Sequence, residues 1–321
     1  MLDRVPVVDL RDFLAARNPD APDAPDAQAR RAAFIAVLGE GLERFGFVAV
    51  TGHGIAPELL AQAYQLAEQT FALPESVKRQ YETPHDGRQR GFTSFGVEHA
   101  KDHPVGDLKE FWHVGRELGA EHALHLSGDV PPNQFPKELP AFQDTFLGLF
   151  NALEGFANQL LSAVGLYLGR DEAFFSRLTH DGNSVLRIIH YPSLGEQLPE
   201  GAIRAAAHED INLLTVLPVS TKPGLELLTR DGEWMAVEVP PDTMVCDTGD
   251  MMQLLTGRRL PATTHRVVNP RGGGQDGARL SMPFFLHPHP DAMLTPMSGD
   301  AAAVLTRDFF HQRLREIGVE S

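Results

Sequence analysis

The chain has 321 residues, of which 42% are hydrophobic and 22% are charged, so it can bury a sizeable core in one elaborated domain or two smaller ones. Its formal net charge of −15 argues against nucleic acid and anionic membrane as partners, because both are bound through basic patches. The N-terminal residues lack the pattern of a signal peptide, no apolar run approaches the length of a membrane span, and the single cysteine, Cys246, cannot form an internal disulfide; we therefore expect a cytoplasmic protein.

Signals for strands and helices alternate through the first part of the chain. Residues 5–10 are rich in valine and predict a strand, whereas the acidic, proline-rich tract 18–27 predicts a surface loop because it has little to bury. Apolar residues at helical spacing predict a helix over residues 30–44, and Gly46 separates this helix from the next strand. A further helix is predicted for residues 57–71.

The next segment is rich in histidine. The spacings are irregular and no cysteine pair accompanies them, so we expect surface or supporting side chains rather than a second metal site. The histidines concerned are His85, His99, His103, His113, His122 and His125.

Two patterns are visible in the second half of the chain. Residues 143–168 carry apolar side chains nearly all round a helix, which predicts one long helix that backs a sheet. From about residue 185 to residue 287 strand signals prevail. Cys246 lies in one of these apolar strands, and we expect it to be a buried cysteine rather than a nucleophile.

A histidine and an aspartate two residues apart predict a metal site. On a strand, alternate side chains share a face, so His208 and Asp210 would project together while Glu209 points away. A third ligand must come from elsewhere, and His265 opens a β-branched run that predicts another strand. Two imidazoles and one carboxylate can occupy one face of an octahedral ferrous ion and leave the opposite face open. The three residues therefore form a candidate iron site.

A carboxylate-binding pair follows the proposed ligands. Residues 279–286 predict a third strand, on which Arg279 and Ser281 share a face. A guanidinium group beside a hydroxyl group is well suited to hold a carboxylate in one orientation.

These pieces, in this order, resemble the isopenicillin N synthase-like family of Fe(II)/2-oxoglutarate-dependent oxygenases. The resemblance covers most of the chain, with further landmarks at residues 5–10, 44–55, 90–92 and 186–192. It implies an α+β fold in which helices flank a core that is a distorted double-stranded β-helix, or jelly roll, with residues 143–168 as a long backing helix. An N-terminal α/β region, residues 1–125, would pack on a catalytic core, residues 126–321, which ends in a C-terminal helix, and the two would form one compact unit.

The resemblance also implies an activity. The chain would be an Fe(II)- and 2-oxoglutarate-dependent dioxygenase that uses O2 to oxidise, most simply to hydroxylate, a small molecule, with release of succinate and CO2. Arg279 and Ser281 would bind the distal carboxylate of 2-oxoglutarate, and Tyr191 would be a further contact. The sequence Ile189-His190-Tyr191-Pro192 departs here from the Asn-Tyr-Tyr-Pro pattern of plant members. No residue beyond the metal ligands is assigned a catalytic role.

Two residues and one segment can each be interpreted in two ways. His190 belongs either to the pocket wall or to the opposite face of its sheet, and Arg187 lies either near the site or on the surface. Residues 107–114 either shape the mouth of the active site, as the resemblance suggests, or pack an apolar face on the barrel.

Other functions stay open. An oxidase of the isopenicillin N synthase type would use no 2-oxoglutarate and would hold its substrate's carboxylate with the Arg-x-Ser pair. A noncatalytic barrel that binds a ligand would have no evident need for all three metal ligands, and zinc hydrolysis would leave the acid-binding strand unexplained. The identity of the substrate and the oligomeric state do not follow from the sequence.

Overall fold

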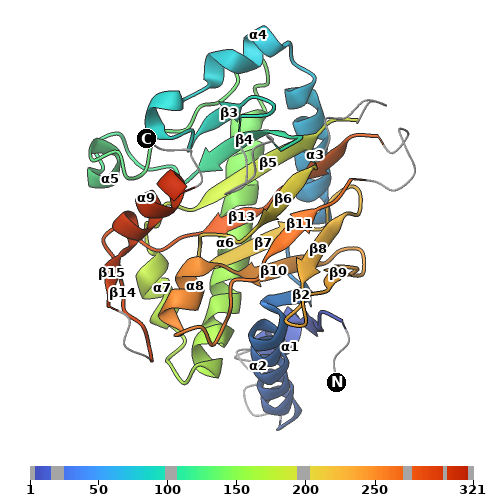
Figure 1. Ribbon diagram of the computed structural model, residues 1–321, viewed down its shortest axis with the longest axis vertical. Coiled ribbons are helices and arrows are strands. Elements are labelled where there is room, and N and C mark those ends of the chain that lie inside the picture. The colour runs from blue at the N-terminus through green and yellow to red at the C-terminus, as the bar shows by residue number, and fades with distance from the viewer. Residues whose placement is uncertain are drawn as a thin grey trace.

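A computed structural model describes residues 4–15, 25–97, 107–193, 203–269, 277–298 and 302–316. Its core is a nine-stranded sheet that draws strands from both halves of the chain (Figure 1). The strand order is β1 (Val7–Asp9), β2 (Phe47–Thr51), β10 (Met244–Thr248), β7 (Leu214–Pro218), β13 (Phe284–Leu286), β5 (Val185–Tyr191), β4 (Glu110–Gly115) and β3 (Gly91–Thr93), and β12 (Arg279–Ser281) pairs with β5 outside this order.

A smaller sheet lies against the inner face of the large one. Its order is β6 (Ala205–His208), β11 (His265–Val267), β8 (Leu225–Leu228) and β9 (Trp234–Ala236). Side chains of both sheets meet in one buried apolar cluster, in which Phe111, Ile189 and Tyr191 of the large sheet contact Ala205 and Val267 of the small one. The two sheets therefore enclose a shared interior, as in a jelly roll.

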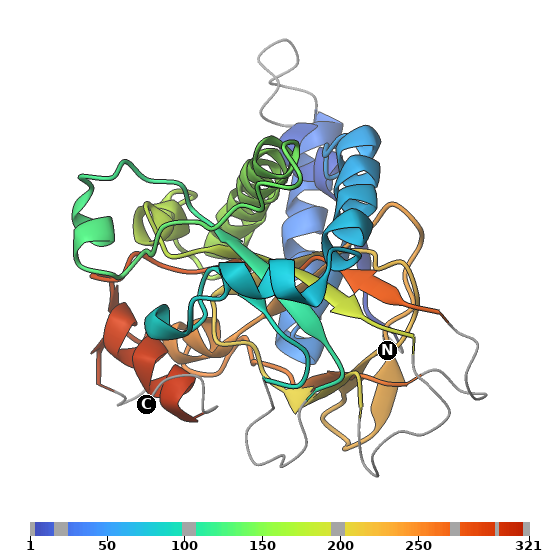
Figure 2. The same cartoon turned by 90° about the horizontal axis from the view of Figure 1, so that it is seen from above.

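Helices cover the outer face of the large sheet and its ends. Figure 2 shows α2, α3 and α6 together on one side of this sheet. The helices are α1 (Leu10–Ala15), α2 (Pro25–Phe45), α3 (Pro57–Phe71), α4 (Glu75–Lys78), α5 (Ala123–Leu126), α6 (Phe142–Tyr167), α7 (Phe174–Thr179), α8 (Asp250–Leu255) and α9 (Thr306–Glu316). A short hairpin of β14 (Met293–Leu294) and β15 (Val304–Leu305) precedes α9.

Helix α6 is the long backing helix that the sequence predicts. Its buried residues recur at intervals of three and four, as in Phe146, Leu149, Phe150 and Leu153, and they form the main core together with α2, α3 and the sheet. The ring of Phe150 meets that of Phe284 on β13 edge-on, with ring centres 5.0 Å apart. Each fully buried Leu or Phe side chain contributes roughly 1.5–3 kcal/mol, so this helix anchors the sheet that carries the site.

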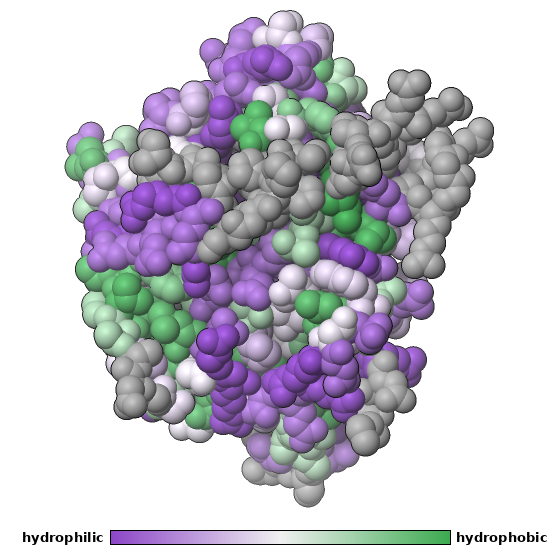
Figure 3. All heavy atoms as spheres, viewed as in Figure 1, coloured by the Kyte–Doolittle hydropathy of each residue, from purple (hydrophilic) through white to green (hydrophobic). Residues whose placement is uncertain are grey.

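Hydrophilic and apolar side chains lie over different parts of the outer surface. In the view of Figure 3, hydrophilic side chains cover α4 and α9, whereas an apolar area lies near the hairpin of β14 and β15, where Met293 is 47% exposed.

Two predictions for the N-terminal part need correction. The first strand is shorter than expected, because Leu10 already begins α1. The tract 18–27 is not a loop throughout: residues 16–24 lie outside the described residues, but Pro25 begins α2 and Ala27 is buried. Proline is compatible with a first helical turn, since its missing N–H would have no partner in the helix there.

The strand expected over residues 279–286 is interrupted. It forms β12 and β13, with Met282 and Pro283 between them, because proline has no N–H to donate to β5. The register continues across the break: Ser281 lies opposite Ile189, and Phe284 lies opposite Leu186. Arg279 and Ser281 therefore still share one face.

Candidate active site

His208, Asp210 and His265 lie together at the edge of the small sheet. His208 ends β6, His265 begins β11, and the two are direct register partners, so both imidazoles project from the same face. The Asp210 Oδ1 atom lies 3.8 Å from Nε2 of His208 and 3.9 Å from Nε2 of His265. One ligand atom from each residue falls within 4.8 Å of the others, and among the described residues no other group of three or more His, Cys, Asp or Glu side chains meets this criterion.

Asp210 lies two residues beyond the end of β6, in a segment without regular secondary structure. The expectation that one strand carries both residues is wrong, because β6 ends at His208. The carbonyl of Asp210 instead accepts a hydrogen bond from the amide of Asp250 at the start of α8 (2.8 Å), and the carbonyl of Ile211 accepts one from Met251 (3.1 Å). These bonds hold the segment that places the carboxylate beside both imidazoles.

Both imidazoles present Nε2 to the site. Their Nδ1 atoms are hydrogen-bonded to backbone carbonyls two residues earlier, His208 to Ala206 (2.7 Å) and His265 to Thr263 (3.1 Å). Burial lowers the pKa of His208 to about 4, which keeps this imidazole neutral at pH 7. A neutral imidazole with Nδ1–H engaged is the form that binds metal ions through Nε2.

Asp210 is held in its ionised form. Burial alone would raise its pKa, but the adjacent His265 and His208 and the hydroxyl of Thr215, which donates a hydrogen bond to Oδ2, outweigh this effect and lower the pKa below its usual value. Burial and the charge of Asp210 raise the pKa of Asp247 well above its usual range, so Asp247 stays protonated beside it. Two imidazoles and one carboxylate are a donor set that suits a divalent transition metal ion such as Fe(II).

Glu209 is turned away from this group, as expected. Its Oε1 accepts a hydrogen bond from the Thr264 hydroxyl (3.0 Å).

Arg279 forms a second, deeper part of the site. It is 2% exposed, and its Nε and Nη2 donate to the carbonyl of Lys222 (3.0 Å) and the hydroxyl of Ser220 (2.8 Å). The Ser220 hydroxyl lies 3.0 Å from that of Ser281. The guanidinium carbon lies 5.0 Å from the ring centre of Tyr191, which is its register partner on β5.

One donor of this arginine is unsatisfied. Within the described part of the chain, Nη1 of Arg279 is buried and has no hydrogen-bond partner. Burial lowers the pKa of Arg279, but an arginine starts from so high a pKa that the group is still cationic at neutral pH. A buried cation with an unused donor beside a serine hydroxyl is a site that a carboxylate would complete.

A cavity of about 520 Å³ leads to the triad from outside. His208 and Asp210 line it, whereas Arg279, Ser281 and Tyr191 are not among the described residues that do. The inner face of β5 connects the two regions: Arg187 lines the cavity, and Tyr191 lies beside Arg279, about 13 Å further along the strand at 3.3 Å per residue.

Residues 107–114, which include most of β4, fit both interpretations. Lys109, Phe111 and His113 line the cavity, while Trp112 and Val114 are buried in the core with α6. His190, in contrast, belongs to the opposite face of β5. Its ring stacks on Phe71 of α3, and its Nδ1 is 2.8 Å from Oε1 of Glu110. Arg187 lies near the site and not on the outer surface.

Sequence reasoning missed two residues of the cavity wall. Arg88 lies in a turn before β3, and Arg313 lies in α9, more than two hundred residues later; both line the cavity. No local pattern marks either residue, since each reaches the site only through the packing of distant elements.

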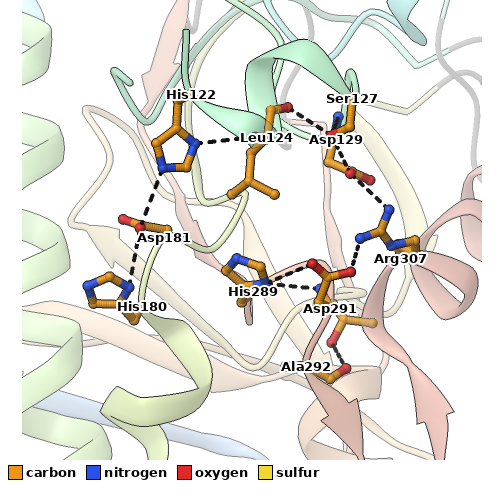
Figure 4. Close-up of polar contacts among 11 residues, drawn as sticks. His122, Leu124, Ser127, Asp129, His180, Asp181, His289, Asp291, Ala292 and Arg307 are labelled. Atoms are coloured by element: carbon orange, nitrogen blue, oxygen red, sulfur yellow. Dashed lines mark hydrogen bonds and ion pairs between the residues drawn. The ribbon is translucent and has the colours of Figure 1, made fainter. Parts of the chain in front are cut away.

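Among the described residues, no histidine of the histidine-rich segment belongs to a group of three or more close His, Cys, Asp or Glu side chains. His99 and His103 lie outside them. His122 belongs to a polar network with Asp181 and His180, next to a second group in which Arg307 pairs with Asp129 (3.0 Å) and Asp291 (Figure 4). These contacts connect α5, the end of α7 and the start of α9, so they explain these polar side chains as structural contacts.

The chain matches family models and known proteins in sequence. A model described as the N-terminal region of non-haem dioxygenase in morphine synthesis matches residues 5–138, and a model of the 2OG-Fe(II) oxygenase superfamily matches residues 182–288. A 2-oxoglutarate-Fe(II) type oxidoreductase of Emericella nidulans is 30% identical over 278 residues, which cover 84% of this chain and 78% of that protein.

Solved structures give the same result. A crystal structure described as a 2OG-Fe(II) oxygenase family protein of Caulobacter crescentus has a TM-score of 0.84 and 35% identity, and the match covers 99% of this chain and 100% of that one. A full-length protein of Neurospora crassa, solved in complex with alpha-KG, has a TM-score of 0.81 over 97% of this chain and 96% of that one; at 21% identity it shows the fold alone. These matches confirm the α+β jelly-roll fold expected from the sequence.

None of the helices in the described ranges is both long and apolar enough to cross a membrane. The matches to a family model, a relative and a solved structure agree with one another. The chain belongs to the 2-oxoglutarate-Fe(II) oxygenase superfamily and is an Fe(II)- and 2-oxoglutarate-dependent dioxygenase that acts on a small molecule.

Proposed function

We propose that His208, Asp210 and His265 bind the ferrous ion of this enzyme. One observation carries the proposal: three buried or half-buried donor atoms converge, and each histidine has Nδ1 engaged so that Nε2 faces the carboxylate. Thr215 supports Asp210 from the other side, as hydrogen-bonded neighbours of metal ligands commonly do.

Arg279 and Ser281 are proposed to hold the distal carboxylate of 2-oxoglutarate, with Tyr191 as the surface under the guanidinium group. The unsatisfied Nη1 of Arg279 and the Ser281 hydroxyl supply the donors, while Ser220 and Lys222 fix the orientation of the arginine. The apolar side chains of Ile189, Ala205 and Val267 keep the space between the sheets dry, which strengthens the ion pair.

The reaction proposed is hydroxylation of a C–H bond of a molecule bound in the cavity beside His208 and Asp210. When bound, Fe(II) and 2-oxoglutarate supply the oxidising power through O2, with succinate and CO2 as products. The residues of the chain position the co-substrate and the substrate on either side of the triad and limit the access of water.

We also propose that the enzyme acts on a small molecule in the cytoplasm. The net charge of −15 disfavours nucleic acid as a substrate, and the single cysteine, buried in β10, is compatible with a reducing compartment in which iron stays ferrous.

The test is an anaerobic titration of the purified protein with Fe(II) and then with 2-oxoglutarate. We expect one iron per chain and, on addition of 2-oxoglutarate, the weak visible absorption band of a 2-oxo acid chelated to Fe(II). His208→Ala and Asp210→Ala should lose stoichiometric iron. Glu209→Gln, from the same segment but turned away, is the matched control and should retain it. Iron bound at wild-type affinity by either alanine variant would disprove the ligand assignment.

A further inference from the structure

A buried histidine, His287, lines the cavity beside the proposed metal ligands but is not one of them. It follows the last residue of β13 and shares the cavity wall with Phe285, whereas Leu286 between them is buried in the main core. The cavity volume, about 520 Å³, falls within the range of about 300–1,000 Å³ that is usual for small-molecule sites. Asp210 lines the same cavity, so one small molecule can contact His287 and lie beside the triad.

Three contacts hold the imidazole of His287 in one orientation. Its Nδ1 donates to the carbonyl of Phe285 (3.2 Å), its ring meets that of Phe310 edge-on with ring centres 5.2 Å apart, and its backbone N–H donates to the hydroxyl of Ser184 (3.2 Å). A carbonyl oxygen only accepts, so Nδ1 carries the proton and Nε2 is the acceptor of the ring. Burial lowers the pKa of His287 to about 4, although the charge of Asp210 opposes this effect, so the imidazole is neutral at pH 7.

The acceptor nitrogen of His287 is unused. The residue is 7% exposed, and within the part of the chain that the structure describes no group donates to Nε2. Buried polar atoms of proteins nearly always have a hydrogen-bond partner. The proposed ligand histidines show the same pattern, in which Nδ1 binds a backbone carbonyl two residues earlier and Nε2 is left for the metal ion. Since His287 lies outside that group, its Nε2 is available to an organic ligand.

Three carboxylates of the cavity wall already have cationic partners. Asp107 pairs with Lys109 at 2.8 Å, and Asp250 and Glu316 pair with Arg313 at 3.0 and 2.8 Å. A donor group of a ligand would have to compete with these cations for the carboxylate oxygens. It meets no such competition at Nε2 of His287.

Aromatic side chains give the cavity an apolar part. Phe111, Phe285 and Phe310 line it, and Phe310 touches the imidazole of His287. Aromatic walls favour a ligand with an apolar or ring-shaped portion. An ionised carboxylate has no proton to donate to a neutral nitrogen, and an ammonium group would lose more hydration than this acceptor returns. The acceptor therefore matches an uncharged O–H or N–H group.

We propose that His287 binds and orients the primary substrate, and that its Nε2 accepts a hydrogen bond from an O–H or N–H of a small, uncharged molecule with an apolar ring. Neutral alcohols, phenols and N–H heterocycles belong to this class. The inference rests on the proposed function, in which the cavity holds the substrate beside the triad. The hydrogen bond fixes one end of the substrate, so that the same C–H bond always faces the triad.

Pairs of molecules that differ in the donor provide the direct test. The full-length protein, loaded anaerobically with Fe(II) and 2-oxoglutarate, is titrated with phenol and toluene, benzyl alcohol and ethylbenzene, and indole and indene, and binding is followed as a shift of the visible band. The affinity ratio of each pair is compared between the wild type and His287→Phe, because this double ratio cancels the different hydrophobicity of the two probes. We expect it to reach fivefold or more for at least one pair, which corresponds to about 1 kcal/mol for one hydrogen bond.

Further variants separate the acceptor from the packing of the ring. His287→Asn keeps a donor for the carbonyl of Phe285 but has no acceptor at the position of Nε2, so it should lose the preference for donors and replaces His287→Phe if that variant is unstable. His287→Gln can place its amide oxygen near this position and should keep part of the preference. His289→Phe is the matched control, because His289 lies two residues further along the chain and outside the cavity, and it should behave as the wild type.

A second measurement needs neither iron nor turnover. In iron-free protein labelled with ¹⁵N at histidine, the Nε2 signal of His287 is assigned by its loss in His287→Asn. It should have the chemical shift of an unprotonated nitrogen at pH 7. Addition of the donor with the largest double ratio should move this signal, whereas its counterpart without the donor should leave it in place.

Three results would overturn the inference: a double ratio below fivefold for every pair, no band shift with any of the six probes at millimolar concentration, or a protonated Nε2 at pH 7. Failure of the proposed function is distinguishable from all three. In that case the visible band would not form with 2-oxoglutarate in the wild-type protein, whereas the Nε2 signal of the iron-free protein would still respond to the donor.

Discussion

Replacing Arg279 with alanine should leave iron binding intact and greatly weaken binding of 2-oxoglutarate. The side chain is 2% exposed, and two of its three nitrogen atoms already donate to Lys222 and Ser220, so Nη1 is the donor that an incoming carboxylate would use. Removing one member of a buried charge pair costs about 3–5 kcal/mol. At about 1.4 kcal/mol per factor of ten, the apparent constant for 2-oxoglutarate should rise by roughly a hundred to several thousand times.

Two further variants refine this prediction. Arg279→Lys keeps the charge but loses the planar fork, so its effect should be intermediate, and it also preserves much of the packing if the alanine variant is unstable. Ser281→Ala removes one hydroxyl donor to a charged group and should cost about 1.5–3 kcal/mol, or roughly ten- to a hundredfold.

The assay measures succinate formation against 2-oxoglutarate concentration, together with iron content and thermal unfolding of each variant. If the constant for 2-oxoglutarate is unchanged in Arg279→Ala while turnover of the organic substrate falls, Arg279 binds the substrate and the assignment is wrong.

Three further predictions follow from other parts of the structure. Thr215→Val should lower the affinity for Fe(II) about 10–100-fold, because the Asp210 carboxylate loses its hydroxyl donor; equal affinities in a metal titration would contradict this. Gly115→Ala would place a Cβ atom 2.0 Å from Cζ of the buried Arg90, so it should lower the free energy of unfolding by about 1–3 kcal/mol or more in urea; an unchanged midpoint would show that Arg90 can move aside. Burial lowers the pKa of His287 from 6.5 to about 4, so in this pH range the unfolded chain takes up a proton that the folded protein does not. The free energy of unfolding should therefore fall as the pH falls from 6.5 to 4, by up to about 1.4 kcal/mol per pH unit. His287→Gln should flatten this slope, and an identical slope would assign it to other groups.

Much of the framework could be predicted because it depends on local patterns. Helical periodicity over residues 143–168 predicted α6, which spans Phe142–Tyr167, and the helix expected over residues 57–71 is α3. These elements are long and strongly patterned, so their own residues determine where they begin and end.

The metal group could be predicted in part. His208 and His265 were both recognised, but the reason given for Asp210, alternation along one strand, was wrong. Amides of α8, forty residues later, hold the segment that places its carboxylate. The three side chains lie together, as the spacing predicted, although the strand does not continue to Asp210.

By itself, the sequence determined which residues are proposed as metal ligands, which pair on β12 is proposed to bind a carboxylate, and where the principal helices lie, because each of these depends on short local patterns. Only the tertiary structure decided which side chains surround the cavity beside the proposed ligands. His190 and Arg187 lie three residues apart on β5, yet one faces α3 and the other the cavity, and β4 pairing sets His113 opposite Arg187. Arg88 enters the same wall from a distant turn, because strand pairing and sheet packing join residues whose separation in sequence carries no local signal.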